Sequence, residues 1–261
     1  MTDLFKNFDT YSLRARVFPA LIAGLPTLAL LFVLVPWNDI GLSQVTATAM
    51  SFVLLFAFAD VARRRGKLIE AKLGTGTTPE LWYHSNTAIA SGTKDRCRAY
   101  MAKQMKLPAP TAEDETKMPQ QANDFYIAAS NWIREHTRDQ RKFAILFSEN
   151  ITYGFRRNLL GLKPIALAFN ALVLLICGAI LYIRPAYFVQ LTKIDEKLVI
   201  VMIAVVLHSA YMLFAVGAGG LREASWAYGR QLILCCETLM KPEPATPRTP
   251  IKAGAKNNAD H

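Results

Sequence analysis

Arginine residues recur at helical spacing near the middle of the chain. Arg134, Arg138 and Arg141 are separated by four and three positions, which predicts that their side chains share one face of a helix, and Lys142 adjoins them. A guanidinium fork matches phosphate oxygens in both shape and charge. These four residues are therefore a candidate binding surface for a polyanion such as a nucleotide or an oligonucleotide.

A second basic cluster lies earlier in the chain. Lys94 and Arg98 have the same i, i+4 spacing, and Arg96 lies between them. We assign these three residues to the same candidate ligand-binding surface. The alternative is that the basic residues are simply solvated, or pair with acids such as Glu135 and Asp139, because charge runs are commonly solvated.

No catalytic or metal-binding pattern accompanies these clusters. The sequence contains no nucleophile–base constellation, no paired-carboxylate motif and no complete phosphate-binding glycine loop. Neither a C-x-x-C nor an H-x-x-H spacing occurs, which argues against a zinc site. We predict that the protein is not an enzyme and needs no metal or cofactor. The four cysteines are Cys97, Cys177, Cys235 and Cys236.

The composition indicates a membrane protein. Of the 261 residues 52% are hydrophobic and only 19% are charged, whereas soluble domains have about 25% charged residues. Four runs contain no Lys, Arg, Asp or Glu, namely 17–35, 42–59, 165–183 and 198–218, and a helix needs about 20 such residues to span a bilayer. Uniformly apolar runs must form helices in lipid. We predict an all-α membrane protein with four transmembrane helices arranged as two hairpins.

Basic residues predict the orientation of these hairpins. The link 36–41 has no Lys or Arg, whereas Arg63, Arg64 and Arg65 directly follow the second run, so both termini are expected in the cytoplasm. The domains are then an N-terminal tail with the first hairpin (1–62), a basic cytoplasmic domain (63–163), the second hairpin (164–221), and a C-terminal helix with a disordered tail (222–261). Residues 63–163 hold 18 Lys/Arg and 10 Asp/Glu, a net of +8 within a chain of net +10.

The inserted domain is predicted to be mostly helical. Hydrophobic periodicity predicts helices over 93–105, 123–139 and 143–158, and residues 64–73 should continue the second membrane helix. Three prolines and an acidic run predict a loop over 107–121.

Polar residues also follow a helical pattern inside the membrane. Gln44, Thr48 and Ser51 lie at i, i+4 and i+7 of the second run. They are candidate pore-lining residues, or else they pack against a neighbouring helix. Because four helices enclose little space, a channel would require a cyclic oligomer.

Two stretches resemble a known family. Residues 132–164, WIREHTRDQRKFAILFSENITYGFRRNLLGLKP, and residues 11–26, YSLRARVFPALIAGLP, resemble the transmembrane effectors of the Hailong anti-phage defence system. The resemblance implies a bacterial inner-membrane protein and a companion nucleotidyltransferase that makes short single-stranded DNA. It implies that this DNA holds a homo-oligomeric channel closed, and that loss of the DNA during infection opens it. A tetramer is our working assumption.

The resemblance also implies a set of signature positions, without separating DNA contacts from structural roles. Thr93, Lys94 and Arg96 fit the pattern, whereas residues 82–86 are less basic than the family leads us to expect. The other positions are Trp132, Arg134, Thr137, Arg138, Asp139, Glu149, Tyr153, Gly154, Arg156, Arg157, Asn158 and Gly161.

Another class of function stays open. The chain could be a non-conducting membrane anchor that docks a cytoplasmic partner protein through its basic, aromatic surface. A small-solute transporter is disfavoured, because neither hairpin shows a pair of broken helices.

Overall fold

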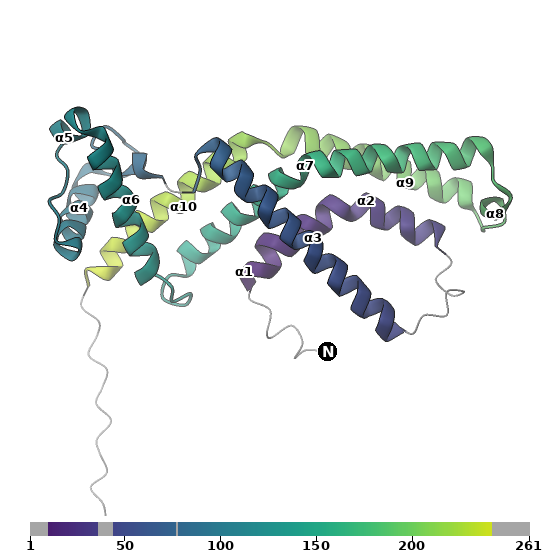
Figure 1. Cartoon of the computed structure of the whole chain (residues 1–261), viewed down its shortest axis with the longest axis horizontal. Coiled ribbons are helices and arrows are strands. Elements are labelled where there is room, and N and C mark those ends of the chain that lie inside the picture. The colour runs from purple at the N-terminus through teal and green to yellow at the C-terminus, as the bar shows by residue number, and fades with distance from the viewer. Residues whose placement is uncertain (1–9, 36–43, 77, 242–261) are drawn as a thin grey trace, which may run out of the picture.

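The computed structural model describes residues 10–35, 44–76 and 78–241, without the side chains of 44–49. Every regular element in this part of the chain is helical, which confirms the all-α prediction (Figure 1). The elements are α1 (Thr10–Ser12), the π-helix η1 (Leu13–Val17), α2 (Phe18–Leu34), α3 (Gln44–Leu73), the 3-10 helix η2 (Pro79–Leu81), α4 (Ser91–Met105), α5 (Ala112–Lys117), α6 (Pro119–His136), α7 (Ala144–Ile183), α8 (Ala186–Val189), α9 (Ile194–Ala210), the π-helix η3 (Tyr211–Ala215) and α10 (Ala218–Leu239).

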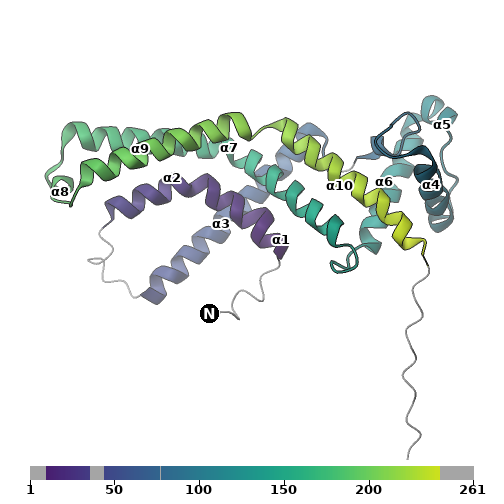
Figure 2. The ribbon, with the colours of Figure 1, turned by 180° about the vertical axis from the view of Figure 1, so that it is seen from behind.

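Helix α7 is the central element of an elongated molecule (Figures 1 and 2). Its 40 residues correspond to a length of about 60 Å. It packs against α10 toward one end, against α2 and α9 toward the other, and against α3 where the two helices cross. We call the group formed by η2, α4, α5, α6 and α10 the head.

Three helices in the described ranges are long and apolar enough to cross a membrane: Thr10–Leu34, Ala144–Ile183 and Ile194–Ala215. They overlap with three of the four predicted spans and support a membrane-embedded protein. The last of them ends at Ala215, before the predicted end at 218, because Val216 leaves the helical conformation. The fourth predicted span, 42–59, begins outside the described residues, and its helix is not among these three. That helix, α3, continues to Leu73 as the sequence predicts.

Helix α3 diverges from α2 instead of pairing closely along its length (Figure 1). Ala59 and Ala62 are buried where α3 crosses the other helices. The apolar part before this crossing is open, and Val53 and Leu54 are 67% and 66% exposed. Such a contiguous apolar surface needs lipid or another protein to cover it.

The paired helices α7 and α9 bury a small polar cluster. Asn170 is buried, and its Nδ2 donates a hydrogen bond to Ser209 Oγ over 2.8 Å and lies 3.0 Å from His208 Nδ1. Polar side chains within a membrane span commonly face other helices in this way. This cluster contributes to the packing of α7 against α9 within the chain.

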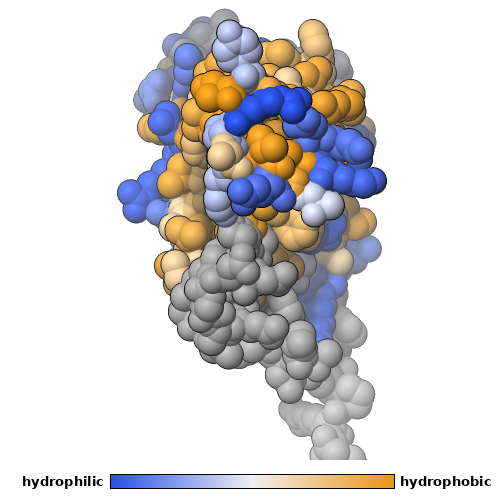
Figure 3. Space-filling view, turned by 90° about the vertical axis from the view of Figure 1, so that its right-hand side faces the viewer, coloured by the Kyte–Doolittle hydropathy of each residue, from blue (hydrophilic) through white to orange (hydrophobic). Residues whose placement is uncertain are grey.

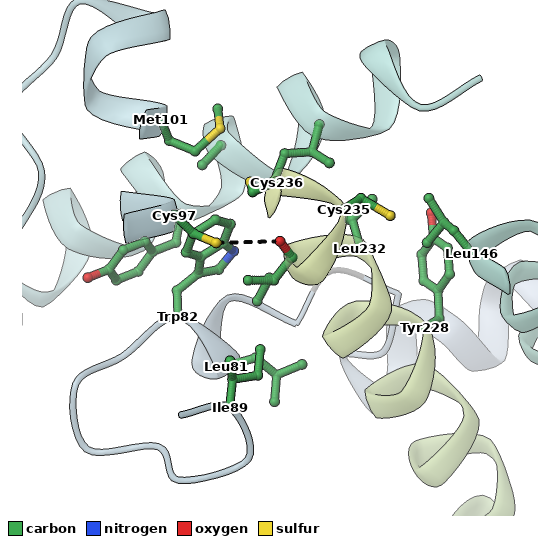
Figure 4. Packing of buried hydrophobic residues seen from close by; sticks show 14 of the residues in the cluster. Leu81, Trp82, Ile89, Cys97, Met101, Leu146, Tyr228, Leu232, Cys235 and Cys236 are labelled. Atoms are coloured by element: carbon green, nitrogen blue, oxygen red, sulfur yellow. Dashed lines mark hydrogen bonds between the residues drawn. The ribbon is translucent and has the colours of Figure 1, made fainter. Parts of the chain in front are cut away.

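The head has its own hydrophobic core, to which α10 contributes although it lies far away in sequence (Figure 4). Trp82 and Cys97 are fully buried, and Cys97 Sγ lies 3.7 Å from the carbonyl oxygen of Ile233 on α10. All four cysteines are free and buried. The head therefore combines the inserted domain with the C-terminal helix, across the domain boundary at residue 222.

One expected loop contains a helix. Within 107–121 the chain forms α5, whose N-terminus has a capping box: Thr111 Oγ1 accepts from the backbone N–H of Asp114, and Asp114 accepts from that of Thr111. Reciprocal capping satisfies N–H groups that would otherwise be unpaired at a helix start. The capping box therefore allows a short helix to form among the prolines that predict a loop.

The end of the molecule opposite the head carries charged residues. Arg184, after α7, pairs with Asp195 over 2.9 Å, and Lys193 pairs with Glu196 over 3.7 Å. Figure 3 looks onto this end and shows hydrophilic residues gathered among hydrophobic ones. Charged residues there end the apolar part of the α7–α9 pair.

Candidate nucleic-acid interface

The predicted arginine face is divided by the end of a helix. Helix α6 ends at His136, so only Arg134 lies within it, and Arg138 and Arg141 belong to the turn before α7. The expectation of a single helix over 123–139 is corrected accordingly. Asp139 explains the turn, because its Oδ1 accepts hydrogen bonds from the backbone N–H groups of Arg141 and Lys142 over 2.8 and 3.1 Å.

The same contacts have an electrostatic consequence. Hydrogen bonds from the N–H groups of Lys142 and Arg141 hold the pKa of Asp139 below its ordinary value. A carboxylate stabilised in this way stays ionised and keeps the turn closed. The turn therefore has a defined shape even though its basic side chains are exposed.

A pocket of about 440 Å³ lies where α6, this turn, α7 and α10 meet. Glu135 is its acidic member, and Leu146 and Phe147 are its apolar members. The remaining lining is basic or polar and consists of Arg134, Thr137, Arg138, Gln140, Asn150 and Tyr228.

Arg134 is the basic residue of this pocket whose side chain is oriented by hydrogen bonds to two neighbouring residues. Its side chain is half-buried; its Nε donates to the Tyr228 hydroxyl over 3.3 Å, and an Nη donates to Asn131 Oδ1 over 3.1 Å. A guanidinium has five N–H donors, so these two contacts orient the group and leave donors for an anion. Arg138 is exposed and forms an ion pair with Glu135.

Arg141 and Lys142 are exposed but do not line the pocket. The ammonium group of Lys142 lies 5.9 Å from the centre of the Phe143 ring. The structure thus brings Arg134 and Arg138 together at one pocket and places the other two beside it, at its turn.

Two of the three residues in the earlier basic cluster are buried instead of exposed. Lys94 is only 1% exposed, and its Nζ donates to the carbonyl oxygens of Tyr83, over 2.6 Å, and of Asn86. Arg98 is 3% exposed and donates to the Trp82 carbonyl oxygen and to Asp95. These side chains bind the preceding loop, so the expectation that they face a polyanion is corrected.

Burial has the expected effect on Lys94. Its removal from water, followed by the proximity of Arg98, lowers the pKa of the ammonium group. Arg96, the third residue of this cluster, is exposed and pairs with Glu237 on α10 over 2.6 Å. It remains accessible, but it lies on the α4–α10 side of the head.

Sequence reasoning missed Tyr228 and Asn150 as pocket residues. Tyr228 lies on α10, which was expected to be a separate C-terminal helix. The missed signal is a stripe of small and apolar residues along α10, including Ala224, Ser225 and Gly229. Gly229 lies so close to the loop before η2 that a Cβ there would be 1.7 Å from Thr78 Oγ1.

Tyr228 links the pocket to the membrane helices. Its ring stacks on that of Tyr153 in α7, with centroids 6.1 Å apart and an angle of 9° between the planes. The Arg157 guanidinium lies 5.6 Å from the centre of the Tyr153 ring and forms an ion pair with Glu70 of α3. Next in sequence, Asn158 Nδ2 donates to the carbonyl oxygen of Ala15 in η1 over 2.6 Å.

Several signature positions of the family resemblance lie at this junction of α7 with α3 and η1. A Cβ on Gly161 would lie 2.6 Å from the backbone nitrogen of Gly66, so only glycine allows the two helices to approach so closely. Gly154 similarly packs against Tyr11 and Ala15. Tyr153, Gly154, Arg157, Asn158 and Gly161 thus connect helices, and none of them lines the pocket.

The candidate pore-lining residues stay a prediction. Gln44 and Thr48 belong to α3, but their side chains lie outside the described residues. Ser51 is exposed on the open part of α3. Comparison with known proteins finds no family model, no curated protein and no solved structure that matches this chain.

Proposed function

We propose that this protein is an oligomeric membrane effector of the Hailong type, an ion channel gated by a single-stranded DNA oligomer. The DNA binds the pocket at the α6–α7 turn, and its release opens the channel and disrupts the membrane during phage infection. The observation that carries the proposal is the position of Arg134, which faces a pocket and also contacts Tyr228, the first residue of a path toward the membrane helices.

Charge and shape at the turn support a polyanionic ligand. Arg134 and Arg138 line the pocket, and Arg141 and Lys142 are exposed beside it. A strand of DNA presents phosphates in series, so it can contact pocket and turn together. The single acid of the lining, Glu135, is paired with Arg138.

Contacts between the pocket and the membrane helices support coupling. A ligand that draws Arg134 away from Tyr228 would alter the Tyr228–Tyr153 stack, which adjoins the Arg157–Glu70 pair between α7 and α3. Coupling requires that the ligand favour one of two arrangements of these contacts. In our proposal the contacts that differ between the open and the closed channel are the Tyr228–Tyr153 stack and the Arg157–Glu70 ion pair.

The exposed apolar part of α3 supports an oligomer. Four copies related by cyclic symmetry would bring this surface to neighbouring protomers or to lipid, and Gln44, Thr48 and Ser51 toward a shared axis. In this arrangement the protein resides in the bacterial inner membrane with both termini in the cytoplasm. A companion nucleotidyltransferase supplies the DNA.

Binding can be tested with the full chain in mild detergent and a fluorescent single-stranded oligonucleotide. Replacing Arg134, Arg138 and Arg141 with Gln should weaken binding and make it less dependent on salt. For three lost phosphate contacts, the slope of log K against log salt concentration should decrease in magnitude by about 2. The matched control is the triple Gln variant of Lys103, Lys106 and Lys117, which are exposed in the head away from the pocket. Equal binding and equal slopes for both triple variants would overturn this site.

The alternative of a non-conducting anchor has its own supporting observation. A second pocket of the head, about 480 Å³ in volume, is bounded by the prolines Pro108 and Pro110 and by Phe125. Leu107 and Met118 beside it are 51% and 43% exposed. An apolar surface of this kind suits a docked protein segment. The anchor predicts no conductance and no bound nucleic acid.

A further inference from the structure

A pocket of about 220 Å³ lies between η1 and α3, and none of its lining residues belongs to the head. Its polar lining consists of Ser12, Arg16, Asp60 and Arg63. Asp60 forms an ion pair with Arg64, whose Nε lies 2.7 Å from its Oδ2. Among the described residues Arg16 and Arg63 form no ion pair, so the remaining charge of the pocket lining is positive.

Arg16 has an unused donor. Its Nε is buried and has no hydrogen-bond partner among the described residues, a state that folded proteins rarely leave unfilled. The guanidinium carbon lies 5.5 Å from the centre of the Tyr11 ring, which holds the group in place. Arg16 also belongs to a π-helical turn, a distortion that is frequent at functional sites.

The position of the pocket indicates the kind of anion. It lies at the beginning of the apolar helix Thr10–Leu34, beside α3 at the point where the apolar residues give way to Arg63, Arg64 and Arg65. Basic residues at such a boundary lie at the level of lipid headgroups. The rest of the lining is apolar, namely Val17, Phe56 and Ala59, and suits the first carbons of an acyl chain.

We propose that the pocket between η1 and α3 binds the phosphate of an anionic phospholipid, with Arg16 and Arg63 as donors to the phosphate oxygens. Ser12 adds a hydroxyl donor, and the apolar lining contacts the glycerol and acyl part. The bound lipid bridges the first apolar helix and α3, which diverge beyond this point (Figure 1). The lipid thereby fixes the angle between them.

The test uses the full chain in nonionic detergent, with thermal unfolding followed during titration with dioctanoyl phosphatidylglycerol, dioctanoyl phosphatidylcholine or inorganic phosphate. We expect phosphatidylglycerol to bind most tightly. Arg16→Gln should weaken its binding about tenfold or more, since hydrogen bonds to charged groups are the strong ones. Arg14→Gln, an exposed arginine of the same π-helical turn that does not line the pocket, is the matched control and should change binding less than twofold.

Arg63→Gln is a second test in case Arg16→Gln does not fold, and it should also weaken binding several-fold. If inorganic phosphate stabilises the unmodified protein, phosphatidylglycerol does not, and the effect of phosphate is lost in Arg16→Gln, then the pocket binds a soluble phosphate instead of a lipid. Equal losses in Arg14→Gln and Arg16→Gln, or no selectivity for phosphatidylglycerol or phosphate, would overturn the proposal. The triple Gln variant of Arg134, Arg138 and Arg141 should bind the lipid normally, which separates this result from the DNA site.

Discussion

The two basic clusters of the head have similar spacing in the sequence and opposite environments in the structure. Lys94 and Arg98 are buried under the loop that carries Trp82, where they donate to backbone carbonyl oxygens. Arg134 and Arg138 flank the end of α6 and line an open pocket. Helical spacing therefore does not settle the environment of a basic side chain, because the helix can end within the pattern, as α6 does at His136, or a neighbouring loop can cover the face, as it covers Lys94 and Arg98.

The largest expected effect concerns the buried cluster. Lys94→Met would leave the carbonyl groups of Tyr83 and Asn86 without their donor, and we expect a loss of about 2–4 kcal/mol in the free energy of unfolding of the head. Denaturant unfolding followed by tryptophan fluorescence measures it, because Trp82 belongs to this core. Lys103→Met, on the exposed side of the same helix, is the control and should change stability little. Similar losses for both variants would contradict the contrast between the clusters.

A second prediction concerns acid stability beside the buried cluster. Glu115 accepts hydrogen bonds from the Tyr126 hydroxyl over 2.5 Å and from His84. Burial alone raises the pKa of this carboxyl, but hydrogen bonds from Tyr126 and then His84 outweigh it and lower the pKa below 4.5. Its stabilising contribution is therefore present above pH 4.5 and is lost as the pH falls through the lowered value.

Glu115→Gln should cost about 1–2 kcal/mol at pH 7, and this difference from the unmodified protein should shrink below pH 4.5. Unfolding curves between pH 7 and pH 3 measure the trend. Glu113→Gln, in the same short helix but exposed, is the control. A difference that does not depend on pH would show that the carboxylate has no such role.

The third prediction tests whether Tyr228 orients Arg134 for ligand binding in the open pocket. Tyr228→Phe removes the hydroxyl that orients Arg134 but keeps the ring that stacks on Tyr153. We expect oligonucleotide affinity to fall about three- to tenfold, with a change in stability of about 1 kcal/mol or less. Anisotropy titrations measure the affinity, with Tyr100→Phe, whose hydroxyl contacts Leu239, as the control. Unchanged affinity would show that Arg134 needs no positioning by α10.

The smallest effect is expected at the exposed member of the earlier cluster. Arg96 pairs with Glu237 at the surface, and exposed ion pairs contribute at most about 1 kcal/mol. Arg96→Gln should therefore lower stability slightly, and a double-mutant cycle with Glu237→Gln isolates the pair. If the coupling free energy of the Arg96–Glu237 pair equals the loss expected for Lys94→Met, then the exposure of these basic residues does not determine how much they contribute to stability.

The membrane helices follow from the sequence because an apolar run is a local property. Helices α2 and α7 and the continuous pair α9–η3 overlap with the runs 17–35, 165–183 and 198–218, although η3 ends at Ala215, before the end of the last run. The end of α6 at His136 does not follow from the apolar pattern, because the turn after it is held by Asp139, which accepts hydrogen bonds from the backbone N–H groups of Arg141 and Lys142. The spacing of apolar residues does not indicate that a side chain will compete with helical hydrogen bonding for these backbone N–H groups.

The candidate site was predictable only in part for a similar reason. Arg134 and Arg138 were identified from their type and spacing, and both line the pocket. Tyr228 comes from a helix that follows the last apolar run, so its place beside Arg134 depends on how α10 packs into the head. The burial of Lys94 likewise depends on a loop whose path local patterns do not predict.

Conductance measurements test the proposed channel function. The full chain is incorporated into planar bilayers and recorded before and after a single-stranded oligonucleotide is added to the side that carries the head, with the triple Gln variant of Arg134, Arg138 and Arg141 alongside. We expect the unmodified protein to conduct ions, the oligonucleotide to close the channel, and the variant to conduct without responding to the oligonucleotide. If the unmodified protein shows no conductance with or without DNA, the channel account is contradicted and the membrane anchor becomes the better explanation.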